Sequence, residues 1–245
     1  MVAQPSPFDA LGAALQPLHP VAVVAVLAMA LLWGRLGPPL DPRRPGAWLG
    51  VLMGVLLYAP TQVWIRGEPT RAAQDIVQSA LGVESYVRAR AVTAIPEALI
   101  AGFATQLVTL FLMLGVVVAL GYPRNTRRSA TAAAAPALGL GGTAAVVALS
   151  RAIAAGPATL ELAWPVIQQM AWLALNFGTA YLLARGRLTG RTGAYAVYAS
   201  LLYAAGAYSE TLATIGWHPA AVSVVLAAVA LAAFSGGAGA VAARR

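Results

Sequence analysis

One apolar stretch near the middle of the chain decides the fold: Ala91–Gly121, which reads AVTAIPEALIAGFATQLVTLFLMLGVVVALG. Its only charged side chain is Glu97, and it runs for about thirty residues, whereas a helix needs ~20 residues at ~1.5 Å each to cross ~30 Å of hydrocarbon. We therefore expect this stretch to form a transmembrane helix that tilts or projects beyond the bilayer.

Six further apolar segments lie on either side of this stretch. Across the chain, 60% of the residues are hydrophobic and 10% are charged, and the mean hydropathy is +0.74, whereas a soluble domain carries about 25% charged residues. The composition predicts an all-α, multi-pass protein of the cell membrane with about seven transmembrane helices. We expect one domain over residues 1–245, with the lipid bilayer as its partner. The six segments are 19–33, 47–65, 130–150, 160–184, 193–215 and 219–242.

The arginines lie between these segments and predict their orientation. All 16 residues of the Lys+Arg total are arginine, and they are spread in twos and threes over loops, so they indicate no nucleic-acid partner. They are densest after the first, third and fifth segments and at the end of the chain. By the positive-inside rule these ends lie in the cytoplasm, which places the N-terminus outside and the C-terminus inside. The arginines concerned are Arg35, Arg43, Arg44, Arg124, Arg127, Arg128, Arg185, Arg187, Arg191, Arg244 and Arg245.

Two stretches outside the apolar segments are predicted to lie on the outer side. Residues 1–18 contain no basic residue and three prolines, which predicts a short outer N-terminal segment rather than a cleavable signal peptide. In residues 66–90, apolar side chains recur at helical spacing and predict an interfacial helix. These apolar positions are Ala72, Ile76, Ala80, Val83 and Val87.

Small residues in two segments predict close contacts between helices. Gly139, Gly141 and Gly142 interrupt the fourth segment, and Gly236 and Gly237 lie near the end of the seventh. Small side chains let helix backbones approach each other in a membrane, so we expect these positions at helix crossings.

A few polar side chains within the segments are candidates for a site. Glu97, Glu161 and Glu210, with His218 close by, all fall toward the predicted outer side. Charged groups in the hydrocarbon cost roughly 2.5–3.5 kcal/mol each, so these residues indicate either a pocket for a cation or proton, or hydrated positions at the interface without chemistry. Because the chain has no cysteine and its two histidines lie at opposite ends, no metal or other cofactor is predicted.

Segments three to six resemble the YhfC family of intramembrane proteases, which is related to the PrsW/CAAX-protease-like group. Ala101–Thr109, AGFATQLVT, is similar to the family's A-G-L-F-E-E-x-G-R, and Ala137–Ala145, ALGLGGTAA, is similar to its G-x-G-H-G-G-x-E-A. Glu161 and the residues after it, and then Ala199–Ala204, fall where the family has a glutamate and two later histidines. The resemblance implies an intramembrane-peptidase scaffold over residues 90–215.

The chain departs from this family pattern at the residues that carry its chemistry. Threonine and glutamine cannot take a proton from water near neutral pH, and glycine offers no side-chain ligand. The resemblance and its departures together predict a protease-like fold without protease activity, acting as a membrane-embedded binding or accessory protein for, among others, a transmembrane helix of another protein. The positions that match the family's acids, arginine and histidines are Thr105, Gln106, Thr109, Gly142, Gln169 and Tyr203.

Two other functions remain open at this stage. The chain could be a small transporter or permease-like subunit that uses Glu97, Glu161 and Glu210 for a cation or proton. It could also be an active intramembrane protease with a divergent site built from the same carboxylates, which would have to lie close together.

Overall fold

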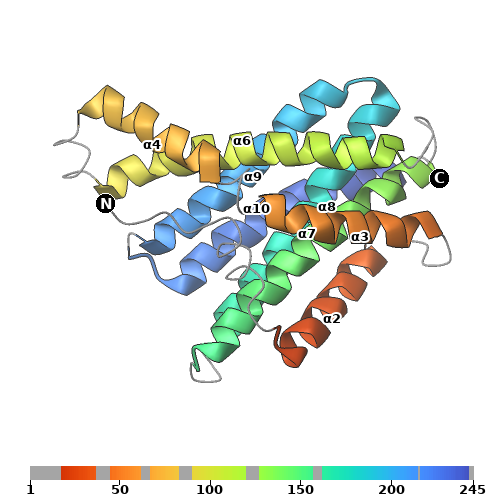
Figure 1. Ribbon diagram of the computed structural model, residues 1–245, viewed down its shortest axis with the longest axis horizontal. Helices are drawn as coiled ribbons and strands as arrows, with labels where there is room; N and C mark the ends of the chain where they lie inside the picture. Colours follow the sequence, from red (N-terminus) through yellow and green to blue (C-terminus); the bar gives the residue numbers. More distant parts are fainter. Residues whose placement is uncertain are drawn as a thin grey trace.

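The computed structural model of the protein describes residues 18–36, 45–61, 67–82, 90–119, 127–156, 162–214 and 216–242, and regular structure in these ranges is helical throughout (Figure 1). The predicted all-α class is therefore confirmed. The helices are α2 (Pro20–Leu36), α3 (Pro45–Pro60), α4 (Gly67–Leu81), α6 (Arg90–Ala119), α7 (Arg127–Ala154), α8 (Ala163–Thr189), α9 (Thr192–Thr214) and α10 (Pro219–Ala242).

Each of the seven predicted apolar segments overlaps one of these helices, and α4 lies within the predicted 66–90 stretch. The predicted thirty-residue segment is the continuous 30-residue helix α6, which includes Pro96 near its start. Apart from α4, successive helices alternate in direction along the bundle (Figure 1). Residues 1–17, where the outer N-terminal segment was predicted, lie outside the described residues.

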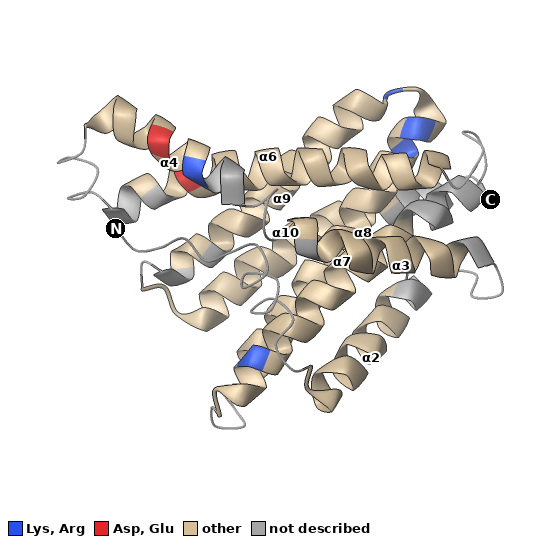
Figure 2. Ribbon diagram, in the orientation of Figure 1, with Lys and Arg blue, Asp and Glu red and all other residues tan. Residues whose placement is uncertain are grey.

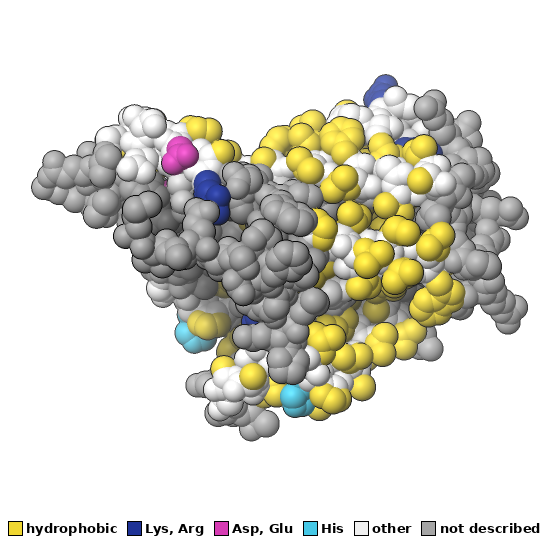
Figure 3. Space-filling view, viewed as in Figure 1, with side chains coloured by type: hydrophobic (Ala, Val, Ile, Leu, Met, Phe, Trp, Pro, Cys, Tyr) yellow, Lys and Arg dark blue, Asp and Glu magenta, His cyan; other side chains and the backbone are white. Residues whose placement is uncertain are grey.

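Three helices in the described part of the chain are long and apolar enough to cross a membrane. They contain the spans Ile95–Ala119, Ala134–Ala154 and Pro219–Gly237, and shorter apolar stretches occupy Pro20–Trp33 and Ala47–Tyr58. Large apolar side chains also point outward: Val24, Leu31 and Val224 are each more than 60% exposed. Figure 3 shows such side chains spread over the described surface, while Figure 2 shows the described charges on or beside α4 and toward the ends of the long helices. This surface suits lipid better than water.

Helix α8 forms the centre of the bundle. Every residue from 171 to 184 is buried, because α8 packs against α7, α9 and α10 (Figure 1). Its crossing with α10 needs glycine on both sides: a Cβ on Gly178 would lie 2.5 Å from the Phe234 nitrogen, and one on Gly237 would lie 2.6 Å from the Tyr181 Cβ. The predicted close contact at Gly237 is thus confirmed.

The crossing of α3 with α7 is closer still. A Cβ on Gly54 would lie 2.1 Å from the Pro136 carbonyl oxygen, and one on Gly139 would lie 2.0 Å from the Val51 carbonyl oxygen. The predicted contact at Gly139 is confirmed, whereas its partner Gly54 was not singled out from the sequence.

Helix α4 packs along α6 and leaves the predicted apolar stripe exposed. Ala73 and Val77 are buried, while Ala72 and Ala80 are exposed and Ile76 is 56% exposed. The described part of the predicted stripe therefore faces outward, the side that an interfacial helix turns to lipid, while Val83 and Val87 lie outside the described residues. Ala73 and Val77 contact the bundle instead.

Candidate binding pocket

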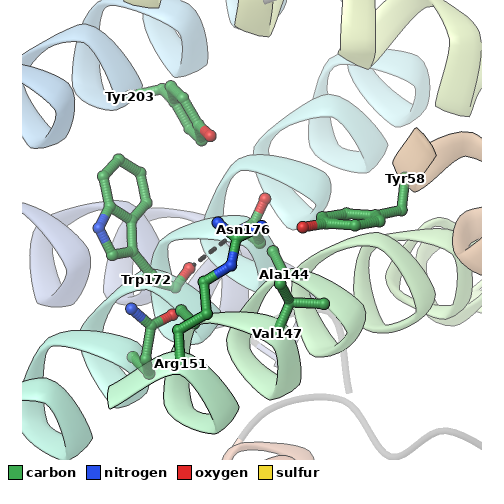
Figure 4. A pocket seen from close by; sticks show the side chains of 10 residues that line it. Tyr58, Ala144, Val147, Arg151, Trp172, Asn176 and Tyr203 are labelled. Carbon is green, nitrogen blue, oxygen red and sulfur yellow. Dashed lines mark hydrogen bonds between the residues drawn. The ribbon is translucent and has the colours of Figure 1, made fainter. Parts of the chain in front are cut away.

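A cavity of about 170 Å³ lies between α3, α7, α8 and α9 (Figure 4). It is surrounded by six side chains with polar or aromatic groups and by small residues of α7. The lining residues are Tyr58, Gly141, Ala144, Val147, Ala148, Arg151, Gln169, Trp172, Asn176 and Tyr203.

The deep end of the pocket is formed by α8. Asn176 lies midway along this helix and is 7% exposed, and its Nδ2 donates a hydrogen bond to the Trp172 carbonyl oxygen at 2.9 Å. Gly141 of α7 makes room for it, since a Cβ there would lie 3.1–3.2 Å from three atoms of the Asn176 side chain. The Trp172 indole packs against the Tyr203 ring, with centroids 4.9 Å apart and planes tilted by 55°. The deep end of the pocket therefore consists of the Asn176 amide, held by its hydrogen bond, beside the packed rings of Trp172 and Tyr203.

The other end of the pocket carries its charge. Arg151 is exposed and lies one turn before the end of α7, and its side chain reaches toward Asn176 (Figure 4). The hydroxyl of Tyr58, which is itself only 5% exposed, points toward the same space. Arg151 is the one ionised side chain among the described lining residues, and it also interacts with a further group of the protein. This end of the pocket is therefore formed by a guanidinium that has a partner.

A buried hydrogen-bonded cluster joins α6 to the same part of α8. Gln106 is 1% exposed, and its Nε2 donates to the Thr179 hydroxyl at 3.1 Å. The Thr179 hydroxyl in turn donates to the Asn176 carbonyl oxygen at 3.0 Å. On α6 itself, the Thr109 hydroxyl donates to the Thr105 carbonyl oxygen at 2.7 Å. The cluster ties α6 to the stretch of α8 that carries the deep end of the pocket.

The six positions that match the family motif thus occupy different surroundings. Gln169 and Tyr203 line the pocket, and Gln106 reaches α8 beside it. Thr105 and Thr109 are buried on α6. A Cβ on Gly142 would meet Leu138 and Val26 at 3.8 Å, which places that position toward α2 rather than toward the pocket.

The candidate carboxylate pocket is only partly within the described residues. Glu97 is buried on α6, Glu161 lies outside the described residues, and the Glu210 side chain is likewise not described. Gly102 packs against Ala204 and Ala207 of α9, and α6 and α9 run in opposite directions (Figure 1). Glu97 therefore lies on the part of α6 that is level with the end of α9, where Glu210 occurs.

His218 has a structural role in the described region. It is exposed, its Nδ1 accepts a hydrogen bond from the Ala220 backbone nitrogen at 3.2 Å, and its ring lies edge-on to Trp164 at 6.2 Å. It therefore caps the start of α10. Among the described residues, no group of three or more His, Asp or Glu side chains could hold a metal ion.

Three pocket residues, Tyr58, Arg151 and Trp172, were not singled out from the sequence. Arg151 carried no distinct signal in the sequence, because Arg66, Arg71, Arg88 and Arg90 lie in a connection on the same predicted outer side. No family model matches the chain, and no curated protein or solved structure matches it either.

Proposed function

We propose that this chain is a seven-pass protein of the cell membrane, with its N-terminus outside and its C-terminus inside, that binds a small molecule without transforming it. The alternating directions of the helices support seven crossings. The arginines at the end of α8 and directly after it support a cytoplasmic location for that end. Arg151 and the open end of the pocket then lie on the outer side.

The chemistry of the pocket lining carries the proposal. Its described polar groups are one guanidinium, two amides, two phenols and an indole. Hydrolysis needs a base that takes a proton from water, or a metal that activates it. Amides and a guanidinium do neither near neutral pH, so this lining suits recognition better than proteolysis. This agrees with the protease-like but inactive scaffold that the family resemblance implies.

The size of the pocket limits what can occupy it. A cavity of about 150 Å³ holds a benzene molecule, so about 170 Å³ accepts a compound of that order. A transmembrane helix is ~10 Å across and cannot enter. A partner helix, as predicted from the sequence, would instead have to pack on the outer apolar face, so the small-molecule role is the one that the pocket supports.

Transport is the second candidate, and the burial of Glu97 favours it. This carboxylate is 6% exposed on a helix of membrane-spanning length, at the level of the α9 end that includes Glu210. A buried acid of this kind is common on ion and proton pathways. The candidate predicts that Glu97→Gln abolishes proton-linked uptake into proteoliposomes, whereas the binding proposal predicts no uptake to abolish.

Cysteine labelling tests whether the pocket is open to water. The chain contains no cysteine, so Ala148→Cys introduces a single thiol at a half-buried residue of the lining. We expect it to react with a water-soluble methanethiosulfonate in nanodiscs. The matched control is Ala174→Cys, at a fully buried position of α8 outside the pocket, which should not react. Equal, slow reaction of two folded variants would refute a water-accessible site.

A further inference from the structure

Two amides and an indole follow one another along the face of α8 that lines the pocket. Gln169, Trp172 and Asn176 occur at helical spacing, and the two amides are separated by two turns, roughly 10.5 Å along the axis. We propose, on the basis of the binding function above, that the pocket binds a small uncharged aromatic solute with a hydrogen-bonding group at each end. The inner group is an amide-like N–H donor. Arg151 and Tyr58 each interact with another group of the protein, so the polar recognition is assigned to the two amides.

The Asn176 amide presents an oxygen to the deep end of the pocket (Figure 4). Its Nδ2 donates to the Trp172 carbonyl oxygen at 2.9 Å, and because a carbonyl can only accept, this bond fixes which end of the amide is the oxygen. Asn176 is 7% exposed, and the described residues supply no donor to its Oδ1. A buried acceptor without a donor is costly, so this oxygen favours a ligand that brings an N–H group.

The same oxygen discriminates against an anionic end group. A carboxylate would meet the Asn176 Oδ1 with lone pairs only, whereas a carboxamide donates to it. An anion also loses more hydration than a neutral amide when it enters a largely apolar cavity. The deep end therefore favours the carboxamide over the carboxylate of the same shape.

The Gln169 amide receives the other end of the ligand. It is half-buried in the lining, and no described residue shares a hydrogen bond with its side chain. An amide both donates and accepts, so it can bind a hydroxyl or a carbonyl group. Because Gln169 and Asn176 lie two turns apart, the two polar groups of the ligand belong at opposite ends of its ring.

The wall between the two amides suits a flat apolar ring. The Trp172 and Tyr203 rings pack with centroids 4.9 Å apart, and Ala144, Val147 and Ala148 offer only small aliphatic surface from α7. An aromatic ring gains by contact with such rings beyond the area it buries. The volume of about 170 Å³ accommodates one substituted ring, given that a cavity of about 150 Å³ accommodates benzene.

Protection from thiol labelling tests this ligand class. Gly141 of α7 lies against Asn176, and α7 and α8 run in opposite directions (Figure 1). Ala148, seven residues after Gly141, is therefore level with Gln169, so a bound ring should shield the thiol of Ala148→Cys from a small neutral methanethiosulfonate. We expect para-hydroxybenzamide to protect at concentrations at least about tenfold lower than para-hydroxyacetophenone, which lacks the N–H donor, or para-hydroxybenzoate, which is charged.

Two substitutions in Ala148→Cys assign the two ends of the ligand separately. Asn176→Leu should weaken protection by para-hydroxybenzamide to the level of para-hydroxyacetophenone, because the acceptor for the N–H group is gone. Gln169→Met should weaken it to the level of benzamide, which lacks the hydroxyl, and should leave benzamide itself unchanged. The control is Gln168→Met, at a half-buried neighbour that is not among the described lining residues, and it should change neither. Thermal unfolding identifies variants that have lost their fold, and Gln169→Met carries the test if Asn176→Leu is one of them.

Equal protection by para-hydroxybenzamide and either comparator, or protection by none of them, would overturn this ligand class. The labelling itself would still uphold a water-open pocket, since it is measured without any ligand. An equal effect of Gln168→Met and Gln169→Met would overturn the assigned position of the ring. Protection by para-octyloxybenzamide, which carries an alkyl tail, but not by para-hydroxybenzamide would assign the ring to a lipid and overturn the free solute.

Discussion

The crossing of α3 and α7 gives the sharpest quantitative expectation. In Gly54→Ala the new methyl group would lie 2.1 Å from the Pro136 carbonyl oxygen and 2.8 Å from the Leu140 nitrogen. In Gly139→Ala it would lie 2.0 Å from the Val51 carbonyl oxygen. These neighbours are backbone atoms, so no side chain can rotate away, and the two helices must separate.

The separation can be estimated from contact distances. A carbon atom approaches a carbonyl oxygen to ~3.3 Å at closest, so each alanine must push the helices apart by about 1.2 Å. Overpacking of this kind costs ~1–3 kcal/mol and occasionally more. For a chain of this length, that corresponds to a Tm lower by roughly 2–12 °C, at ~2–4 °C per kcal/mol.

Thermal unfolding in detergent, followed by circular dichroism at helical wavelengths, measures the loss. Gly115→Ala is the matched control, because it replaces a glycine of α6 whose added Cβ has nothing within 4 Å. There, alanine should stabilise the helix by up to ~1 kcal/mol. The double variant Gly54→Ala/Gly139→Ala should cost less than the sum, since one displacement relieves both clashes. If the single variants are as stable as Gly115→Ala, the close backbone contacts at Gly54 and Gly139 are refuted.

Four further outcomes follow from the site. Gln106→Ala, which removes the α6–α8 hydrogen bond, should destabilise the protein by ~0.6 kcal/mol and at most ~1.7, measured by the same unfolding. Gly141→Ala should slow labelling of Ala148→Cys by displacing Asn176, whereas Gly142→Ala, with its nearest contacts at 3.8 Å, should not. Glu97→Gln should leave that labelling rate unchanged, because Glu97 is not among the described lining residues. Loss of labelling in this variant would favour the carboxylate site. Elemental analysis of the purified protein should find zinc below stoichiometry, and a full equivalent would contradict a non-metal pocket.

The positions of the helices could be read from the sequence because apolar length is a one-dimensional property. The stretch predicted from Ala91 to Gly121 appears as the helix Arg90–Ala119, and the stretch from residue 219 to 242 appears with the same bounds. Breakers such as Gly121 and Pro123 end one segment, and arginines begin the next. No tertiary information was needed for this part of the fold.

The pocket could not be read in the same way, because it depends on how each helix is rotated. On α8 the polar residues Gln169, Asn176 and Thr179 recur at helical spacing, but this pattern does not show which neighbouring helices they face. Trp172 and Tyr58 look like ordinary core residues in the sequence. They become a wall only once α3, α8 and α9 meet. For α4 likewise, the sequence predicted an apolar stripe but not that Ala73 and Val77, on a neighbouring face, contact the bundle.

The glycines of α7 resemble a family motif in sequence, but the structure shows that they serve helix packing. Ala137–Ala145 resembles a catalytic motif, but in this fold its glycines have separate packing roles. Gly139 lets α3 approach, Gly141 leaves room for the Asn176 side chain, and Gly142 faces α2. The contact between α3 and α7 requires glycine at position 139, and the space for the Asn176 side chain requires glycine at position 141. Packing alone therefore explains glycine at positions 139 and 141, because the backbone approach and the cavity both depend on the missing side chains.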